Sequence, residues 1–158
     1  MLTDFEQPIV SFFQDAADVL GAPRSVAAVY GILFASPQPL CFGEIEVKLG
    51  ISKGSVSQGL KALKEIGAVK SSEHPGDRRE WYEVDIELRK LIRSFIEGRV
   101  ETQLRKGGDR LERIKSQLPN TDPAAARILT DRLELLESWQ KKAKALIPIV
   151  KAFLALGG

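Results

Sequence analysis

Residues 40–84 combine two helix-like apolar patterns, a glycine between them and two strand-like runs after them. In the first pattern, Ile45 and Leu49 are four residues apart, a spacing that puts both side chains on one face of a helix. Gly50 follows, and a glycine here ends a helix at little cost because it readily adopts a positive φ. The sequence therefore predicts two short helices joined by a tight turn.

The second of these helices is predicted over residues 52–66, with Ser52 as its N-cap. Val56, Leu60 and Leu63 recur at helical spacing and form its apolar face. The opposite face carries short polar and cationic side chains, which suit a helix that lies against bases and phosphates. These candidate DNA contacts are Lys53, Ser55, Ser57, Gln58, Lys61 and Lys64.

A β-hairpin is predicted directly after the two helices. Residues 68–71 and 79–84 read as its strands, with the strand-favouring aromatic residues Trp81 and Tyr82 in the second, and residues 73–78 have the composition of a turn. Beside a DNA-reading helix, the tip of such a wing often reaches the minor groove or the DNA backbone. The residues expected near this tip are His74, Arg78 and Arg79. The order of elements predicts a winged helix-turn-helix domain.

Two stretches of this region carry a resemblance to a known family: LGISKGSVSQGLKALKEIGAVK and, after it, HPGDRREWYEV. Together they resemble the winged-helix domain of MarR-superfamily regulators, most closely the GbsR-like branch, which also tends to carry a G-x-P-R segment upstream, here residues 21–24. The similarity spans residues 5–85, about half of the chain. The resemblance implies a homodimeric transcription regulator whose dimer is made by helices outside the winged domain. Arg24, near the start of the second predicted helix, is a further candidate contact to the DNA backbone.

Apolar residues at helical spacing predict two helices upstream of the motif, over residues 4–20 and 23–35. Gly21 ends the first helix, and the Ser-Pro-Gln-Pro run after residue 35 ends the second. We therefore expect three parts in the chain. They are an N-terminal helix at residues 1–22 that supports dimerisation, the winged domain at residues 23–85 and a helical dimerisation region at residues 86–158.

The C-terminal region is predicted to form two long helices, over residues 86–118 and 123–156, that fold back as an antiparallel hairpin. Residues 107–108, both glycine, are expected to kink or break the first helix, and Pro148 to bend the second or mark a local break. The second helix carries two apolar stripes, and a two-helix hairpin cannot bury both. We expect the surplus to pack on the winged domain or, mainly, on a second subunit. The candidate dimer interface consists of Leu129, Leu133, Leu136, Trp139, Ala143, Ile147, Val150 and Leu154.

The composition argues against a membrane-spanning, secreted, disulfide-rich or zinc-binding protein, but it does not identify a function. The net charge of +2 does not by itself point to nucleic acid. No apolar run reaches the length of about 18 residues that a transmembrane helix needs, and the first residues lack the basic and apolar regions of a signal peptide. A single cysteine excludes a disulfide framework and fits a reducing cytoplasm, and one cysteine with one histidine leaves too few ligands for zinc.

Other readings compete with DNA binding. We find no phosphate-binding loop, nucleophile elbow or metal cluster, so neither an enzymatic activity nor a cofactor is expected. A winged helix can also serve as a protein-interaction module without binding DNA, and this stays the alternative function. Cys41, at the start of the first motif helix, resembles the redox sensor of some single-cysteine relatives, but a small buried or capping residue is the expected role.

Taken together, these features predict a mostly α-helical, cytoplasmic protein with a small β-wing that binds double-stranded DNA and regulates transcription as a repressor. It is expected to act as a homodimer on a pseudo-palindromic site, with its two reading helices about 34–36 Å apart. The family resemblance also implies regulation by a small-molecule effector, which the sequence does not identify.

Overall fold

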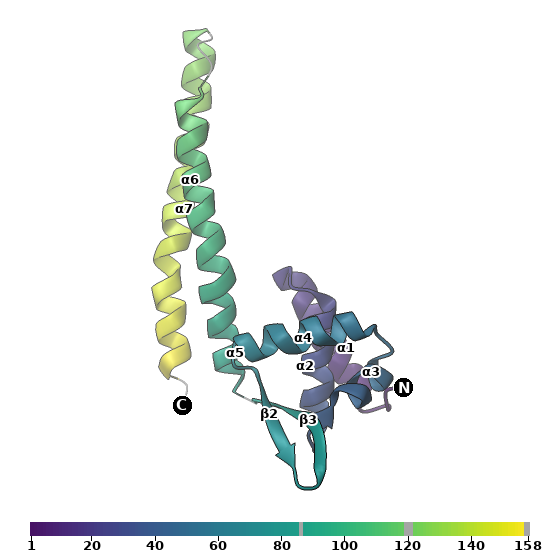
Figure 1. Ribbon diagram of the computed structural model, residues 1–158. Helices are drawn as coiled ribbons and strands as arrows, with labels where there is room; N and C mark the ends of the chain where they lie inside the picture. The colour runs from purple at the N-terminus through teal and green to yellow at the C-terminus, as the bar shows by residue number, and fades with distance from the viewer. Residues whose placement is uncertain (86, 119–121, 157–158) are drawn as a thin grey trace. The chain divides into compact units, whose positions relative to one another are not determined.

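The computed structural model describes residues 1–85, 87–118 and 122–156 (Figure 1). These residues form two compact units, Met1–Leu91 and Ile92–Gly158. In the described parts of the chain, no helix is both long enough and apolar enough to cross a membrane.

Residues 1–85, all of which the structure describes, contain four helices and three strands, and the predicted helices and the predicted hairpin are confirmed with ends shifted by a few residues. The elements are α1 (Glu6–Leu20), α2 (Arg24–Ala35), β1 (Leu40–Cys41), α3 (Phe42–Leu49), α4 (Lys53–Glu65), β2 (Val69–His74) and β3 (Asp77–Val84). Gly21 and Gly50 both have a φ of 62° and end α1 and α3, as predicted. The Oγ of Ser52 accepts a hydrogen bond from the backbone N–H of Ser55 at 3.2 Å, which confirms Ser52 as the N-cap of α4.

A hydrophobic core joins α2, α3, α4 and the wing. Ile32 of α2, Ile45 of α3 and Val56 of α4 are fully buried in it. Gly59 brings α4 close to α2, because a Cβ at this position would lie 2.9 Å from Cγ2 of Val29. The core therefore fixes which face of α4 is turned inward and leaves the opposite face to solvent.

The sheet is antiparallel in the order β1-β3-β2. The short strand β1 was not predicted, since residues 40–41 were expected to lead directly into a helix; instead Leu40 pairs with Tyr82 of β3. The wing strands are also longer than predicted. Their connection is reduced to Pro75 and Gly76, where Gly76 has a φ of 85°, so the expectation of a turn over residues 73–78 was wrong at both ends.

The second unit is a helical hairpin. Helix α5 (Leu88–Phe95) spans the boundary between the units and continues into a π-helical segment, η1 (Ile96–Val100), followed by α6 (Glu101–Ser116) and α7 (Pro123–Leu156). Helices α6 and α7 lie side by side (Figure 1), joined by ion pairs such as that between Lys151 Nζ and Glu101 Oε1 at 2.7 Å. The predicted antiparallel hairpin is confirmed.

Of the kink or break expected at residues 107–108, the break was wrong, since α6 runs through both glycines without interruption. The side chain of Gln140 on α7 lies against this part of α6. Its Nε2 donates a hydrogen bond to the carbonyl oxygen of Leu104 at 2.6 Å, and a Cβ on Gly108 would lie 2.9 Å from the same nitrogen. The helical irregularity lies instead at η1, and α7 continues through Pro148.

Candidate nucleic-acid interface

Helix α4 presents a polar outer face. Its inner face buries Val56, Leu60 and Leu63 in the core. On the outer face, Lys53, Ser57, Gln58 and Lys61 are exposed, and none of these four side chains forms a hydrogen bond or an ion pair with another described residue. The spacing of Lys53, Ser57 and Lys61 puts them on one side of the helix. This part of the predicted DNA-contacting set is therefore available to a partner.

In the first turn of α4, Gly54 leaves the backbone exposed. A Cβ on Gly54 would meet no atom nearer than Ser52 Oγ, at 3.8 Å, so nothing in the fold requires glycine at this position. Ser55, predicted as a DNA contact, is half-buried, and its Oγ lies 3.0 Å from Ser52 Oγ. The hydroxyl of Ser55 is thus part of the helix cap, whereas Gly54 leaves the backbone open to close approach.

The wing carries one cation without a partner. Arg78 is exposed, and its guanidinium has no hydrogen bond or ion pair within the described residues. His74, which pairs with Asp77 across the hairpin, stacks on the ring of Trp81 with a centroid distance of 4.5 Å. Arg78 is therefore the freest of the three residues predicted near the wing tip.

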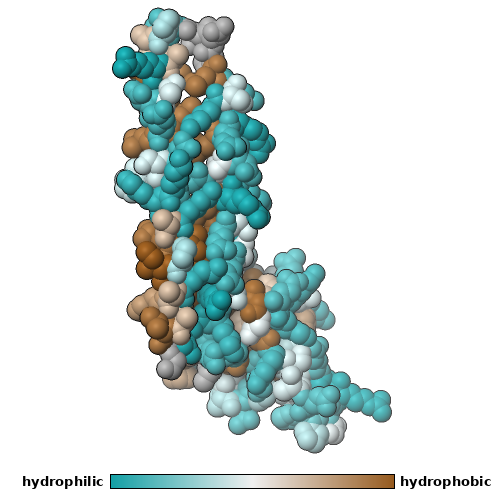
Figure 2. All heavy atoms as spheres, turned by 90° about the vertical axis from the view of Figure 1, so that its left-hand side faces the viewer, coloured by the Kyte–Doolittle hydropathy of each residue, from teal (hydrophilic) through white to brown (hydrophobic). Residues whose placement is uncertain are grey.

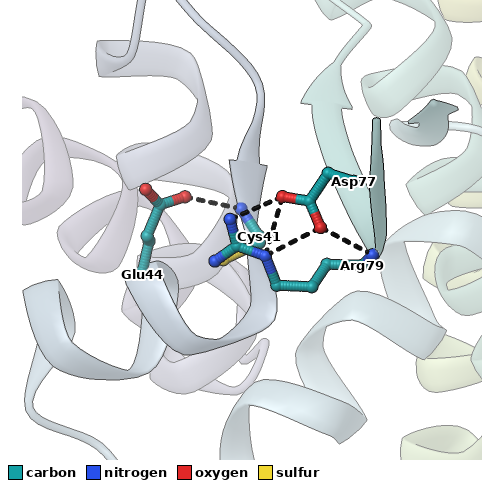
Figure 3. A network of polar contacts seen from close by, with 4 residues as sticks. All are labelled: Cys41, Glu44, Asp77 and Arg79. Carbon is teal, nitrogen blue, oxygen red and sulfur yellow. Dashed lines mark hydrogen bonds and ion pairs between the residues drawn. The ribbon is translucent and has the colours of Figure 1, made fainter. Parts of the chain in front are cut away.

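Arg79 is held in a network that joins the wing to the start of α3 (Figure 3). Its Nη2 lies 2.6 Å from Oδ2 of Asp77, and its Nη1 donates to the sulfur of Cys41 at 3.5 Å. Hydrogen bonds from the Arg79 side chain hold the pKa of the Asp77 carboxyl at about 2, below its usual 3.8. The charge of Arg79 is thus compensated and its orientation is fixed.

Cys41 in this network is the N-cap of α3 and is buried. Its backbone N–H donates to Oε2 of Glu44 at 2.9 Å, the return half of a capping box (Figure 3). These contacts agree with the buried, capping role expected for this residue.

Two further predicted DNA contacts have acidic partners. Lys64, near the end of α4, forms an ion pair of 2.7 Å with Glu80 of β3. Arg24 pairs with Asp18 of α1 and lies 4.0 Å from a carboxylate oxygen of Asp15. The sequence did not predict these two ion pairs, because the partners in each lie on different elements. The alternation of side chains along β3 showed only that Glu80 and Tyr82 share a face of the strand.

The predicted dimer residues fall on two sides of α7. Leu136 and Trp139 are exposed to 54% and 62%, and Val150 is also exposed. Leu129, Leu133, Ala143, Ile147 and Leu154 are half-buried. Apolar side chains gather along the helical hairpin in Figure 2. The exposed ones extend beyond the predicted set to Ile128, Leu135, Leu146, Ile149, Phe153 and Leu156.

Comparisons with known proteins agree with this fold. The family model described as bacterial regulatory protein, arsR family, matches residues 32–71, from the end of α2 through α3 and α4 to the start of β2. Over 110 residues the chain is 24% identical to the HTH-type transcriptional repressor GbsR of Bacillus subtilis (strain 168). This alignment covers 70% of the chain and 61% of GbsR, so the chain spans less than two thirds of that relative's length. The match confirms the predicted resemblance to GbsR.

One solved structure extends the comparison to most of the chain. A crystal structure of a transcriptional regulator has a TM-score of 0.53 at 17% identity, and the superposition covers 93% of this chain and 98% of that one. A mutant of S. aureus MepR bound to an oligodeoxyribonucleotide has a TM-score of 0.43 at 17% identity, covering 84% of this chain and 91% of that one. The first likeness shows a shared fold and confirms the predicted fold class. These relatives are named as regulators, not as enzymes.

Proposed function

We propose that this winged helix-turn-helix protein, a relative of GbsR, binds double-stranded DNA and regulates transcription. The observation that carries the proposal is the outer face of α4, where Lys53, Ser57, Gln58 and Lys61 are exposed and have no partner among the described residues. The apolar face of the same helix is buried in the core, so a duplex would meet the polar face. Cationic and amide side chains on such a face match the phosphates and base edges of a major groove.

The contacts divide by position along α4. Its N-terminal turns would enter the groove most deeply, so Lys53, Ser57 and Gln58 are our candidates for reading base edges. A glutamine amide can bond adenine in a bidentate manner, which gives Gln58 the clearest capacity for sequence readout. Lys61 would bind a phosphate, and Arg78 would contact the DNA from the wing.

The other predicted contacts have a different role in this proposal. His74 stacks on Trp81 and Arg79 pairs with Asp77, so we propose that their main role is to stabilise the wing. Ser55 caps α4, and Arg24 joins α2 to α1. For Arg24 and Arg79, a phosphate would compete with the carboxylates that they pair with.

We further propose that the DNA-bound form is a homodimer in which the exposed apolar face of α7 packs on a second copy. Leu135, Trp139, Leu146 and Phe153 are each more than half exposed and recur along one side of the helix. An exposed stripe of large apolar side chains is unusual on a monomer, and two copies related by a two-fold axis would each cover the stripe of the other. Such a dimer would present two α4 helices to a symmetric site. Because GbsR is named a repressor, we propose the same direction of regulation here.

The test is binding to a fluorescently labelled random-sequence duplex over a range of salt concentrations. The full chain should bind at low salt and dissociate as salt rises. Lys61→Gln should reduce the steepness of log affinity against log salt by about 0.9 for every protomer on the duplex, because it removes one phosphate contact. Lys106→Gln, an exposed lysine of α6, is the matched control and should leave the slope unchanged. If the full chain shows no affinity for duplex at low salt, the proposal fails and a protein-docking role for the winged unit replaces it.

A further inference from the structure

Glu80 of β3 accepts hydrogen bonds from three different elements. Its Oε1 accepts from Nζ of Lys64 on α4 at 2.7 Å and from Oγ of Ser71 on β2 at 2.6 Å. Its Oε2 accepts from the hydroxyl of Tyr82, two residues along the same strand, at 2.8 Å. One carboxylate thus links the C-terminal end of α4 to both strands of the wing.

The position of Glu80 on the strand explains why these donors meet. Side chains alternate between the faces of a strand, so Glu80 and Tyr82 share a face, and Ser71 is paired with Tyr82 across the sheet. Lys64 approaches from α4, with Nζ also 5.7 Å from the centre of the Tyr82 ring. Glu83 lies on the opposite face of β3, where it pairs with Lys70 of β2 at 3.0 Å. The two glutamates therefore form similar ion pairs, but only Glu80 reaches α4.

The three donors also favour the ionised form of the carboxyl. Hydrogen bonds from Lys64 first, then Ser71 and Tyr82, lower the pKa of Glu80 from 4.5 to about 2. Burial, together with the hydrogen bond to Glu80, raises the pKa of Tyr82 to about 12, so the hydroxyl keeps the proton that it donates. The arrangement carries one negative and one positive charge at neutral pH, and Lys64 adds no net charge to the outer face of α4.

We propose that Glu80 is a positioning residue for DNA recognition: it withholds Lys64 from the phosphates and holds the wing at a fixed distance from α4. This inference rests on the proposed function of α4. An isolated surface ion pair contributes little, but here one carboxylate has three donors, and a lysine that left for a phosphate would expose an unpaired anion beside the DNA backbone. Like charges brought together in this way disfavour docking in the wrong register. Glu80 thus reduces affinity that does not depend on sequence and leaves recognition to Lys53, Ser57, Gln58 and the wing.

The test compares Glu80→Gln with Glu83→Gln in the full chain, using the random-sequence duplex and the salt titration described above. Both variants gain one unit of positive charge on β3, and each releases one lysine. Glu80→Gln should steepen the salt slope by about 0.9 for every protomer bound, because Lys64 becomes free to neutralise a phosphate. Glu83→Gln should leave the slope unchanged, because Lys70 lies on the other face of the wing.

Lys64→Gln shows whether the effect passes through this lysine. In the otherwise unaltered chain Lys64→Gln should leave the slope as it is, and in the Glu80→Gln variant it should restore the original slope. A steeper slope caused by other cations freed in a damaged wing would survive Lys64→Gln, so this double variant separates the two causes. The inference is overturned if Glu80→Gln leaves the slope unchanged or lowers it, if Glu83→Gln has an equal effect, or if the increase survives Lys64→Gln. Absence of any duplex binding by the unaltered chain would instead refute the proposed function, and this inference with it.

Discussion

Replacing Gly54 with alanine should stabilise the winged unit and weaken its binding to DNA at the same time. A Cβ at this position has only Ser52 Oγ within 4 Å, at 3.8 Å, so the fold accepts it without a clash. Glycine in a helix costs roughly 0.5–1 kcal/mol relative to alanine. Since Gly54 lies in the first turn of α4, we expect the lower end of this range as a gain in the free energy of unfolding.

The effect on binding should have the opposite sign. Gly54 lies on the part of α4 proposed to enter the groove most deeply, where an added methyl group would meet the DNA. Inserting a methyl group into a packed contact typically costs about 1–3 kcal/mol, so the dissociation constant for a duplex should rise by at least about five-fold. A variant that folds better and binds worse cannot be explained by loss of structure.

Gly59→Ala is the matched control on the buried side of the same helix. Its Cβ would lie 2.9 Å from Cγ2 of Val29 and 3.3 Å from Cβ of Val29, so overpacking of about 1–3 kcal/mol exceeds the gain in helix propensity. This variant should unfold more easily while its folded fraction binds DNA as before. Unfolding in urea can be followed by the fluorescence of Trp81 in a Trp139→Phe background, and binding by anisotropy of a labelled duplex. Unchanged affinity for Gly54→Ala would refute close approach of DNA to the first turn of α4.

Three further changes test other parts of the structure. Arg78→Ala should lower the salt slope by about 0.9 for every protomer bound and leave the wing folded, because its guanidinium has no partner in the described chain; an unchanged slope would remove Arg78 from the contacts. Leu135→Asp should convert the dimer to a monomer in sedimentation experiments, because Leu135 lies on the proposed apolar face of α7, whereas Lys144→Asp, on the opposite side of this helix, should not; a dimer that persists in Leu135→Asp would exclude this face from the interface. Glu80→Gln should lower the free energy of unfolding by an amount that is constant well above pH 4.5 and shrinks as the pH falls towards 2, because a lowered pKa contributes stability only while the carboxyl is ionised; a difference that is undiminished at pH 2 would contradict this assignment.

Local patterns were sufficient to predict most of the winged unit. The apolar spacing of Val56, Leu60 and Leu63, with Ser52 before it and Gly50 before that, specifies the position and the inner face of α4. Such features depend on neighbours within one or two turns, which a sequence shows directly. Strand β1 was missed for the opposite reason: two residues carry no periodicity, and they become a strand only because β3 pairs with them.

Sequence patterns could not predict which charged residues form ion pairs with one another. Lys64 and Lys61 look equivalent in the sequence, yet Lys64 meets Glu80 and Lys61 has no partner in the described chain. The helix also continues through Gly108, where Gln140 of the facing helix packs against it, and the sequence does not show this contact. In both cases the deciding contact joins residues on different elements, so its existence depends on the completed fold.

Chemical modification of lysines, read by mass spectrometry with and without duplex, tests the central claim most directly. Lys53 and Lys61 should react readily in the free protein and become protected when duplex is added, while Lys106 in the helical hairpin keeps its reactivity. Lys53 and Lys61 that remain reactive in a protein shown by anisotropy to be fully bound would contradict contact between the outer face of α4 and DNA.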